Sequence, residues 1–465
     1  MTYRSLERAN AYFYDPVRRP AVMKRHGGIA YLSSGVNHLK APDVLLDIAG
    51  RELKERRLIE NYTSPGGALG VAAAISFELH ERLGRTSFDT IGPANVCLTV
   101  GATGALAGAF RYLAAVAGAR SALVLGLNYS FFSTICDEVG IAYRTVCSQE
   151  PGRLLPSAAE ACDMIFRQRP AIVVLSQPTN PSGELYDEAD LRRVVETADA
   201  HGCWLVFDEV PSLASPAEED LPAPIVGGTE NFPPRLIWIN SFSKSRSLAG
   251  LRVGYMAATA PIVDYVRKAN ERLLWSPVNA GSSALIADMV LRAICRRTKG
   301  VAAADTSRTI AETVRRAGRY LRVFAPYSDD FARLEGIWDF IDGATDWSAA
   351  HASYRADLDD VARTCRSNWR TFSERMAPYV RQAIALQSGF NHCVKLDTRL
   401  SEWDFVTTAF DAAGVDFYTE SVFSDHDDAT SPDFWLRVSC AVERETFTHG
   451  TERLAALLAH GSHSH

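Results

Sequence analysis

Residues 171–208, with the sequence AIVVLSQPTNPSGELYDEADLRRVVETADAHGCWLVFD, contain two short apolar runs separated by an amphipathic helical pattern. The apolar runs are Ala171–Leu175 and Trp204–Phe207, and the helical spacing covers Glu188–His201. Short apolar strands that alternate with helices are typical of a parallel sheet covered by helices on both faces. This stretch therefore predicts an α/β fold.

The alternation continues on both sides of this stretch. Further strand candidates are Ser121–Leu125, Leu236–Ile239, His392–Leu396 and Trp435–Ser439, and further helix candidates are Phe132–Val139 and Thr306–Val323. From about Asn279 the pattern is mainly helical, before strands return near the C-terminus. We therefore expect a large domain, in which helices sandwich a mostly parallel sheet, and a smaller C-terminal α+β domain.

Composition limits the class of protein. The 465-residue chain is 47% hydrophobic and 22% charged, and its 49 Lys and Arg against 55 Asp and Glu give a net charge of −6. These values are those of a soluble globular protein with more than one domain. Because no stretch concentrates Lys and Arg, we expect neither nucleic acid nor a membrane surface as a partner.

Three features favour a cytoplasmic location. The start, MTYRSLERANAYF, carries charge and lacks the apolar core of a secretory signal. The longest uncharged run, Thr90–Phe110, is broken by Gly and Pro, so it predicts a strand, a glycine turn and a buried helix rather than a membrane span. The nine cysteines are scattered without a CxxC pair, and we expect them to be buried, reduced thiols.

Polar residues follow four of the predicted strands. They are Gly101–Thr103, Ser176–Gly183, Asp208 and Ser241–Lys244. Ligands of parallel sheets bind beyond the carboxyl ends of the strands, where such residues would gather. The sequence thus predicts a binding site built from these four strand ends.

The most specific pattern is Ser241-Phe242-Ser243-Lys244 followed by GLRVG at 250–254. A lysine nucleophile must be unprotonated, which requires burial or electropositive neighbours, whereas an ordinary loop lysine is solvated. The pattern resembles the cofactor-lysine segment of the class I/II aminotransferases, which have the type I pyridoxal-phosphate fold, and particularly the histidinol-phosphate aminotransferase branch. The resemblance implies that Lys244 binds pyridoxal 5′-phosphate as a Schiff base. It also implies that Ser241 and Arg252 hold the phosphate and that Ser243 contributes to cofactor binding.

The resemblance extends to residues that precede Lys244. Asp208, 36 residues earlier, is implied to keep the ring nitrogen of the cofactor protonated, although an Asp after a strand can also cap a turn or a helix. Asn180, in SQPTNPSG, is implied to donate to the 3′-oxygen of the cofactor; without the resemblance it is simply a good turn residue. Glu209 is expected to be structural.

Three further cofactor contacts carry over. Gly101-Ala102-Thr103 would cradle the phosphate, because small residues let backbone amides approach an anion at a helix N-terminus. Tyr129 matches an aromatic residue that stacks on the cofactor, with a tyrosine of the core as the alternative. Tyr62 matches a tyrosine that reaches the phosphate bound by the neighbouring subunit, which implies a homodimer with shared active sites.

Two positions concern the substrate. Arg437 matches the arginine that binds the α-carboxylate of the substrate. Independently of the resemblance, an arginine inside an apolar strand requires a buried anion to offset its desolvation. Gly35-Val36-Asn37, in YLSSGVN, is expected to line the substrate side.

Two departures from the family pattern lie near the predicted site. The family has a tyrosine three residues after the ring-nitrogen Asp, and here that residue is Pro211, which removes a donor to the 3′-oxygen. The usual Pro-Gly-Ser before a phenylalanine is replaced within Tyr418–Phe423. We therefore expect a different substrate mouth and a different fate for the carbanion formed on the substrate.

The resemblance covers most of Ile29–Leu457 and suggests domain limits. We predict an N-terminal arm with part of the small domain (1–60), a large domain that binds pyridoxal phosphate (61–295), a helical insertion (296–356), a C-terminal small domain (357–460) and a flexible tail (461–465). The insertion, which includes GIWDFIDGATDW at 336–347, exceeds what family members have there. It is either a lid over a large substrate or a surface or dimer-contact elaboration.

Three functions are compatible with these residues. In the leading interpretation, the enzyme removes the α-proton of an α-amino acid with Lys244 as the base and then transfers the amino group. In the second, the same carbanion is diverted to elimination, replacement, cyclisation or oxidation in specialised biosynthesis, which Pro211 and the insertion favour. The third is a cofactor-binding sensor fused to a transcription regulator, which the negative charge and the start of the similarity near residue 29 disfavour.

Other patterns are rejected. Ser241–Lys244 fits the S-x-x-K of serine acylases, but the chain has no Lys-Thr-Gly. LVFDE at 205–209 resembles the acidic strand of ATPases, but the chain has no GxxxxGK[ST] loop. No metal site is expected, because only His460, His463 and His465 of the eleven histidines lie close together, and they belong to the tail.

Overall fold

The computed structural model describes residues 3–85, 91–212, 221–225, 232–324, 336–425 and 429–461. The chain forms two compact units, each assembled from segments far apart in the sequence. The first unit contains Met1–Leu39, Ala119–Leu213 and Val361–His465, and the second contains Lys40–Gly118 and Ala214–Asp360. Residues 462–465 of the predicted tail lie outside the described part. The domain limits taken from the resemblance stay a prediction.

A seven-stranded sheet has the strand order β1-β7-β6-β5-β4-β2-β3. Its strands are β1 (Val96–Val100), β2 (Ser121–Leu125), β3 (Ala142–Val146), β4 (Ile172–Ser176), β5 (Trp204–Asp208), β6 (Leu236–Ser241) and β7 (Val253–Ala257). In the first unit, β2 pairs in parallel with β3 and β4, and β4 pairs in parallel with β5. In the second unit, β7 is antiparallel to both β1 and β6. The predicted α/β fold with a mostly parallel sheet is confirmed.

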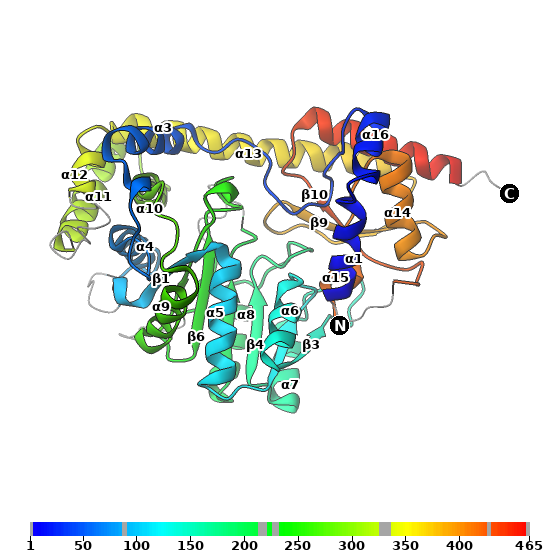
Figure 1. Cartoon of the computed structure of the whole chain (residues 1–465), viewed down its shortest axis with the longest axis horizontal. Helices are drawn as coiled ribbons and strands as arrows, with labels where there is room; N and C mark the ends of the chain where they lie inside the picture. Colours follow the sequence, from blue (N-terminus) through cyan, green and yellow to red (C-terminus); the bar gives the residue numbers. More distant parts are fainter. Residues whose placement is uncertain are drawn as a thin grey trace. The chain divides into compact units, whose positions relative to one another are not determined.

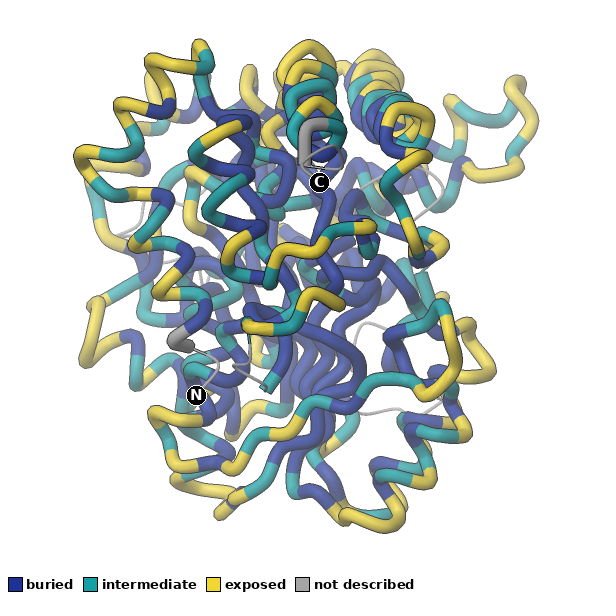
Figure 2. The backbone as a smooth tube through the Cα atoms, turned by 90° about the vertical axis from the view of Figure 1, so that its right-hand side faces the viewer, coloured by how far each residue is buried: buried dark blue, intermediate teal, exposed yellow. Residues whose placement is uncertain are grey.

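Helices flank these strands within each unit (Figure 1). The first unit has α6 (Phe131–Val139) against β3, and α8 (Glu188–Ala200) against β5 and α7 (Ala158–Gln168). In the second unit, α5 (Gly101–Ala115) packs on β1, β6, β7 and α9 (Ala260–Leu274). β4 and β7 are buried at every residue, which explains why their sequences are almost continuously apolar instead of alternating. Figure 2 shows this burial of the strands and the exposed outer turns of the helices.

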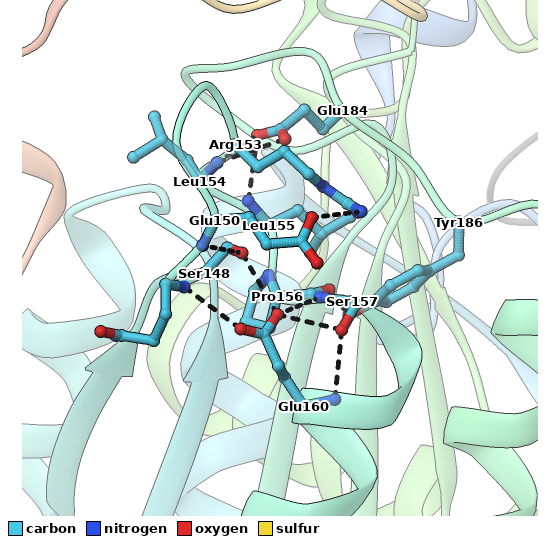
Figure 3. Close-up of polar contacts among 11 residues, drawn as sticks. Ser148, Glu150, Arg153, Leu154, Leu155, Pro156, Ser157, Glu160, Glu184 and Tyr186 are labelled. Atoms are coloured by element: carbon cyan, nitrogen blue, oxygen red, sulfur yellow. Dashed lines mark hydrogen bonds and ion pairs between the residues drawn. The ribbon is translucent and has the colours of Figure 1, made fainter.

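Local sequence signals fix where α6 and α7 begin or end. α7 begins with a capping box, in which Glu160 N donates to Ser157 Oγ (3.3 Å) and Ser157 N donates to Glu160 Oε2 (2.7 Å; Figure 3). α6 ends at Gly140, whose φ of 72° is in the left-handed region that glycine tolerates best. The end of α6 at Val139 agrees with the helix that the sequence predicts over Phe132–Val139, whereas α7 was not predicted.

The first unit also contains the smaller sheet. In it, β9 (Asn391–Leu396) lies between β8 (Val380–Ala383) and β10 (Leu436–Ser439) and is antiparallel to both. Its apolar residues form one core with those of α14 (Glu402–Ala413) and α16 (Arg444–Gly461), including the buried Phe405, Leu436 and Phe447. The other helices of this unit are α1 (Tyr3–Phe13), α2 (Arg18–His26) and α15 (Glu420–Phe423). The predicted return to strands near the C-terminus is confirmed.

The second unit is mainly helical outside its strands. It contains α3 (Asp43–Arg51), η1 (Glu52–Arg56), η2 (Leu58–Glu60), α4 (Leu69–Arg82), η3 (Pro93–Asn95), η4 (Ala249–Leu251), α10 (Ser282–Thr298), α11 (Ala303–Val323), α12 (Ile337–Asp342) and the start of α13 (Trp347–Met376). α10 packs against α3, α4 and α11. None of the helices in the described ranges is long and apolar enough to cross a membrane.

The aromatic residues of 336–347 pack within the second unit. Trp338 and Trp347 are buried, and their rings stack with centroids 5.8 Å apart and an interplanar angle of 18°. The Trp338 indole also lies against Gly318 of α11, where an added Cβ would be 2.7 Å from Nε1. These contacts tie α11, α12 and α13 together. That 296–356 is an insertion, and that it acts as a lid or as an interface, stay predictions.

The contact between β7 and the start of α5 gives a first testable prediction. A Cβ at Gly254 would lie 2.3 Å from Ala102 N and 2.4 Å from the carbonyl carbon of Gly101, both backbone atoms that have little freedom to move. We expect Gly254→Ala to lower the free energy of unfolding by roughly 2 kcal/mol or more, because overpacking against backbone is costly. Gly250→Ala, where no atom lies within 4 Å, is the control. Equal melting temperatures for the two variants would contradict this packing.

Candidate functional site

Lys244 lies in the loop between β6 and β7 of the second unit. Two hydrogen bonds tie this loop to the end of β6: Ser243 N donates to Ser241 Oγ (3.3 Å), and Ser245 Oγ donates to Ser241 O (3.5 Å). Ser241 and Ser243 are buried, and Lys244 is half-buried. The loop is thus well anchored, and Lys244 is partly removed from water, which a nucleophilic lysine requires.

The start of α5 lies at the same edge of the sheet. Gly254 of β7 pairs with Thr99 of β1 and with Ser241 of β6, so the ends of these strands are neighbours. Gly101 opens α5 with a φ of +64°, and its N–H donates to Arg252 O (2.8 Å). A glycine is required here because of this backbone conformation and because of the close approach of Arg252.

The Arg252 side chain lies beside the N-terminus of α5. A Cβ at Gly101 would be 2.8 Å from Arg252 Nη2. The guanidinium therefore adds a full positive charge to the partial positive charge of the helix N-terminus, and this combination suits a phosphate. Within the second unit, the structure brings together the predicted Gly101–Thr103, Ser241, Ser243 and Arg252, with Lys244 in the adjoining loop.

Asp208 is the last residue of β5 in the first unit and is almost completely buried. Its carboxylate accepts hydrogen bonds from Val210 N (2.9 Å) and Ser176 Oγ (3.3 Å). Burial raises the pKa of Asp208 to about 6, although these two hydrogen bonds lower it in part. Within the described residues no Lys or Arg forms an ion pair with Asp208. A buried carboxylate that forms no ion pair favours a cationic ligand.

Ser176 and Asn128 complete the surroundings of Asp208. Ser176 Oγ also lies 2.7 Å from Asn128 Oδ1, which in addition accepts a hydrogen bond from Tyr129 N (2.8 Å). Asn128 is fully buried, and its Nδ2 has no hydrogen-bond partner among the described residues. The sequence reasoning did not assign a role to Asn128. The signal that could have found it is its position directly before Tyr129, just beyond the end of β2.

The turn that carries Asn180 is fixed by a buried carboxylate. Glu184 accepts hydrogen bonds from Leu154 N (3.1 Å), Leu155 N (3.0 Å) and Ser182 Oγ (2.6 Å), as Figure 3 shows for the two backbone donors. Its backbone N–H donates to Thr179 Oγ1 (3.0 Å). These bonds leave the turn little freedom, so the position of Asn180 is set by its neighbours in the chain.

Arg437 lies in β10 of the first unit and is 5% exposed. Its Nη1 donates to Asn180 Oδ1 (3.0 Å), and its Nε donates to Ser33 O (3.1 Å), which also accepts from Nη2. The rings of Tyr418 and Phe423 lie 5.5 and 4.8 Å from the guanidinium carbon. Tyr418 and Phe423 are the ends of the segment that departs from the family pattern, so this departure borders Arg437.

The charge of Arg437 has no close counter-ion. Burial lowers its pKa to about 10, while Tyr418 and Asp416 raise it. The three oxygen contacts of the guanidinium are to neutral groups, and no carboxylate of the described chain forms an ion pair with it. Asp416, the nearest candidate, is itself buried, and burial raises its pKa to about 7. The arrangement therefore favours an anionic ligand at Arg437.

The segment Gly35-Val36-Asn37 approaches Arg437 through its first residue. Gly35 is in contact with Arg437, since an added Cβ would lie 2.7 Å from the guanidinium. Val36 N donates to Ser34 Oγ (3.4 Å). Asn37 is buried, and its Oδ1 accepts from Leu39 N (3.0 Å) within its own turn. Gly35 and Ser33 are thus the residues of this segment that contact Arg437, while a substrate role for Val36 and Asn37 stays a prediction.

The remaining predicted residues belong to both units. Tyr129 is half-buried and stacks on Phe131 with ring centroids 6.2 Å apart. Tyr62 of the second unit is 62% exposed. Pro211 follows β5, and the turn is closed by Ser212 N donating to Glu209 O (3.2 Å). In the described ranges, no group of three or more His, Cys, Asp or Glu could hold a metal ion.

Comparison with known proteins supports one family. The family model described as aminotransferase class I and II matches residues 30–317. The aspartate aminotransferase of Thermotoga maritima is 27% identical over 255 residues, which cover 53% of this chain and 63% of that protein. The histidinol-phosphate aminotransferase of Aromatoleum aromaticum is 29% identical over 176 residues, which cover 35% of this chain and 43% of that protein. The alignments thus span less than two thirds of these relatives.

A solved structure covers nearly the whole chain. The crystal structure of the Thermotoga maritima aspartate aminotransferase has a TM-score of 0.66 and 18% identity, and the match covers 98% of this chain and 99% of that one. At this identity the likeness concerns the fold alone. It confirms the aminotransferase-like fold for the sheet and the helices described above.

The raised pKa of Asp208 gives a second testable prediction. The folded-state pKa, about 6, lies above the usual 3.8, so the stability linked to this group is present at low pH and is lost as the pH rises through about 6. We expect Asp208→Asn to stabilise the ligand-free protein at pH 7.5 by up to roughly 3 kcal/mol. The gain should disappear towards pH 4. Thermal unfolding at several pH values measures both effects.

Glu160→Gln is the matched control in the same unit. Burial raises the pKa of Glu160, but hydrogen bonds from Ser157 and Gln149 outweigh it, and the net shift is downward. The stability linked to Glu160 is therefore present above its usual pKa and is lost as the pH falls, so its replacement should destabilise the protein at pH 7.5. If both variants changed stability in the same direction at pH 7.5, the account of Asp208 would be wrong.

Proposed function

This chain belongs to the class I and II aminotransferase family, and on that premise we propose that it uses pyridoxal 5′-phosphate to transfer the amino group of an α-amino acid. The observation that carries the proposal is a pair of buried charges in the first unit. Asp208 is a carboxylate without a cation, and Arg437 is a guanidinium without an anion, within the described residues. A ligand that offsets both charges must present a cationic group to one and an anionic group to the other.

The residues fit pyridoxal 5′-phosphate chemically. In the second unit, the N-terminus of α5 and Arg252 provide the donors and the positive charge that a phosphate needs. In the first unit, Asp208 would face the ring nitrogen and keep it protonated, and the orphaned Nδ2 of Asn128 is a further donor nearby. We infer from the family membership that both groups serve the same cofactor. When bound, the cofactor provides a ring that accepts the electrons released at the α-carbon of the substrate.

The chain's own residues would supply the remaining steps. Lys244 would hold the cofactor covalently, and its Nζ would take the proton from the α-carbon of the substrate and later return it. Arg437 would bind the α-carboxylate with the planar fork that suits such an anion. Asn180, which already accepts from Arg437 Nη1, would orient this guanidinium and donate to the 3′-oxygen. The substrate class is therefore an α-amino acid with a free carboxylate.

A second candidate function diverts the same carbanion to elimination, replacement, cyclisation or oxidation. Pro211 favours it, because proline has neither a hydroxyl nor a backbone N–H to offer the 3′-oxygen. Product analysis separates the two. Transfer yields a 2-oxo acid and one equivalent of pyridoxamine phosphate, whereas elimination or replacement leaves pyridoxal phosphate unchanged. Oxidation would be recognised by the consumption of dioxygen.

We also propose a homodimer in which Tyr62 reaches the phosphate bound by the neighbouring subunit. Exposed apolar side chains of the second unit support it. They cluster in two short segments of the sequence and are Ile59, Tyr62, Leu273, Leu274, Trp275 and Val278. A group of exposed apolar side chains often marks a surface that binds another protein. A cytoplasmic location is consistent with the nine free cysteines.

The test of the proposed function is the variant Lys244→Ala. We expect the wild-type protein, supplied with pyridoxal 5′-phosphate, to show the visible absorbance band of an imine and to convert an α-amino acid into its 2-oxo acid. Lys244→Ala should lose the band and reduce the rate of transfer by about 1,000-fold or more, because general-base catalysis and covalent binding are removed together.

Lys268→Ala is the control, since Lys268 is an exposed lysine of α9 in the same unit. It should leave both the absorbance band and the rate unchanged. Retention of the band in Lys244→Ala, or its loss in both variants, would refute the assignment of Lys244.

A further inference from the structure

The residue two positions after Lys244 is a buried arginine. Arg246 is 2% exposed, and its Nε donates to Asp288 Oδ1 of α10 (2.5 Å), which is 0% exposed. A fully buried ion pair is a demanding arrangement, because both charges lose their hydration. It is retained here directly beside the loop that carries Lys244.

Asp288 binds two further groups. Tyr354 donates from its hydroxyl to the same Oδ1 (2.5 Å), and Arg292 Nε lies 3.3 Å from Oδ2. The Tyr354 ring lies 5.3 Å from the guanidinium carbon of Arg246 and is itself fully buried. Burial lowers the pKa of Arg292 and Asp288 raises it, with a net shift upward, so this guanidinium stays charged. Asp288 is thus the centre of a buried network.

The network reaches the loop a second time through Ser245. Arg246 Nη1 donates to Ser245 O (3.1 Å), and Arg292 Nη2 donates to Ser245 Oγ (3.3 Å). Ser245 Oγ in turn donates to Ser241 O (3.5 Å). The residues on the C-terminal side of Lys244 are therefore held by side chains from α10, and through Asp288 by Tyr354 from α13.

Such anchoring matters for a lysine nucleophile. The lysine side chain has four rotatable bonds, so its amine is placed accurately only if the backbone that carries it is rigid. A small displacement of a reacting group changes rates strongly. Two hydrogen bonds to α10, those of Arg246 with Asp288 and of Ser245 with Arg292, provide that rigidity, and two more within residues 241–246 support it.

We propose that Tyr354 and Asp288 are positioning residues for Lys244, acting through Arg246 and Ser245. The proposal rests on the proposed function of Lys244 as the cofactor lysine. The start of α13 lies in the predicted insertion 296–356. The proposal gives it a role within the second unit, which is to support the loop between β6 and β7 that carries Lys244.

The experiment compares Tyr354→Phe with Tyr320→Phe. Each variant removes one buried tyrosine hydroxyl of the second unit, and the Tyr320 hydroxyl pairs with Ser76 Oγ (2.8 Å), away from the loop. Three quantities are measured: the melting temperature of the cofactor-free protein, the hydrogen exchange of residues 242–248, and the dissociation constant of pyridoxal 5′-phosphate. Arg246→Lys, which keeps the charge but loses the planar fork, is the second variant.

We expect both tyrosine variants to lower the melting temperature, Tyr354→Phe by more because its hydroxyl donates to a carboxylate. Only Tyr354→Phe and Arg246→Lys should speed the exchange of 242–248 and raise the dissociation constant, each by about threefold to tenfold, because only part of the free energy of the lost hydrogen bond is transmitted to the loop. If Tyr354→Phe had the same exchange rates at 242–248 and the same dissociation constant as the control Tyr320→Phe, the proposal would be overturned. Tyr354 would then have a purely structural role. If the wild-type protein took up no cofactor, the proposed function would fail, while the exchange measurement would still decide whether Tyr354 holds the loop.

Discussion

Asp208 is held at the end of β5 by hydrogen bonds from Val210 and Ser176, and its negative charge has no cation nearby among the described residues. This placement costs stability, because a buried carboxylate is harder to ionise than one in water. Sites with shifted pKa values are often functional. The same physical logic applies to Arg437, which is buried against neutral oxygens. Together, Asp208 and Arg437 favour a ligand that carries both a cationic and an anionic group.

In the second unit, close backbone contacts determine the structure around the start of α5. Gly101 and Gly254 have no side chain, which allows β1, β7 and the start of α5 to pack together. Arg252 and the helix N-terminus then add positive charge where a phosphate would bind. The buried Arg246–Asp288 pair stiffens the adjoining loop. The first unit thus contains two buried charges without counter-ions, those of Asp208 and Arg437. The second unit contains a rigid loop and the positive charge of Arg252 at the N-terminus of α5.

Much of the fold could be predicted because its signals are local. The apolar runs at 121–125, 171–175 and 204–207 coincide with β2, β4 and β5 to within one residue, because strands buried on both faces leave a continuous apolar pattern in the sequence. Lys244, Asp208 and Asn180 could be proposed because their order and spacing follow a family pattern. Asn37 was proposed in the same way; its Oδ1 accepts a hydrogen bond from Leu39 N, and its substrate role stays a prediction.

The Arg246–Asp288–Tyr354 network could not be predicted, because its partners are 42 and 66 residues apart and no periodicity encodes their contact. One signal was present: Asp288 interrupts the apolar run SSALIADMVL, and a charge inside a buried helix needs a partner. The identity of that partner is decided by how α10 and α13 pack. Asn128 was missed for a similar reason, since its relation to Asp208 passes through Ser176 on another strand.

The most direct test of the central claim is to treat the protein with pyridoxal 5′-phosphate and borohydride and to locate the reduced adduct by peptide mass spectrometry. Borohydride fixes an imine as a stable secondary amine on the lysine that formed it. The account predicts one phosphopyridoxyl group per chain, on Lys244. An adduct spread over exposed lysines such as Lys268, with Lys244 unmodified, would contradict it.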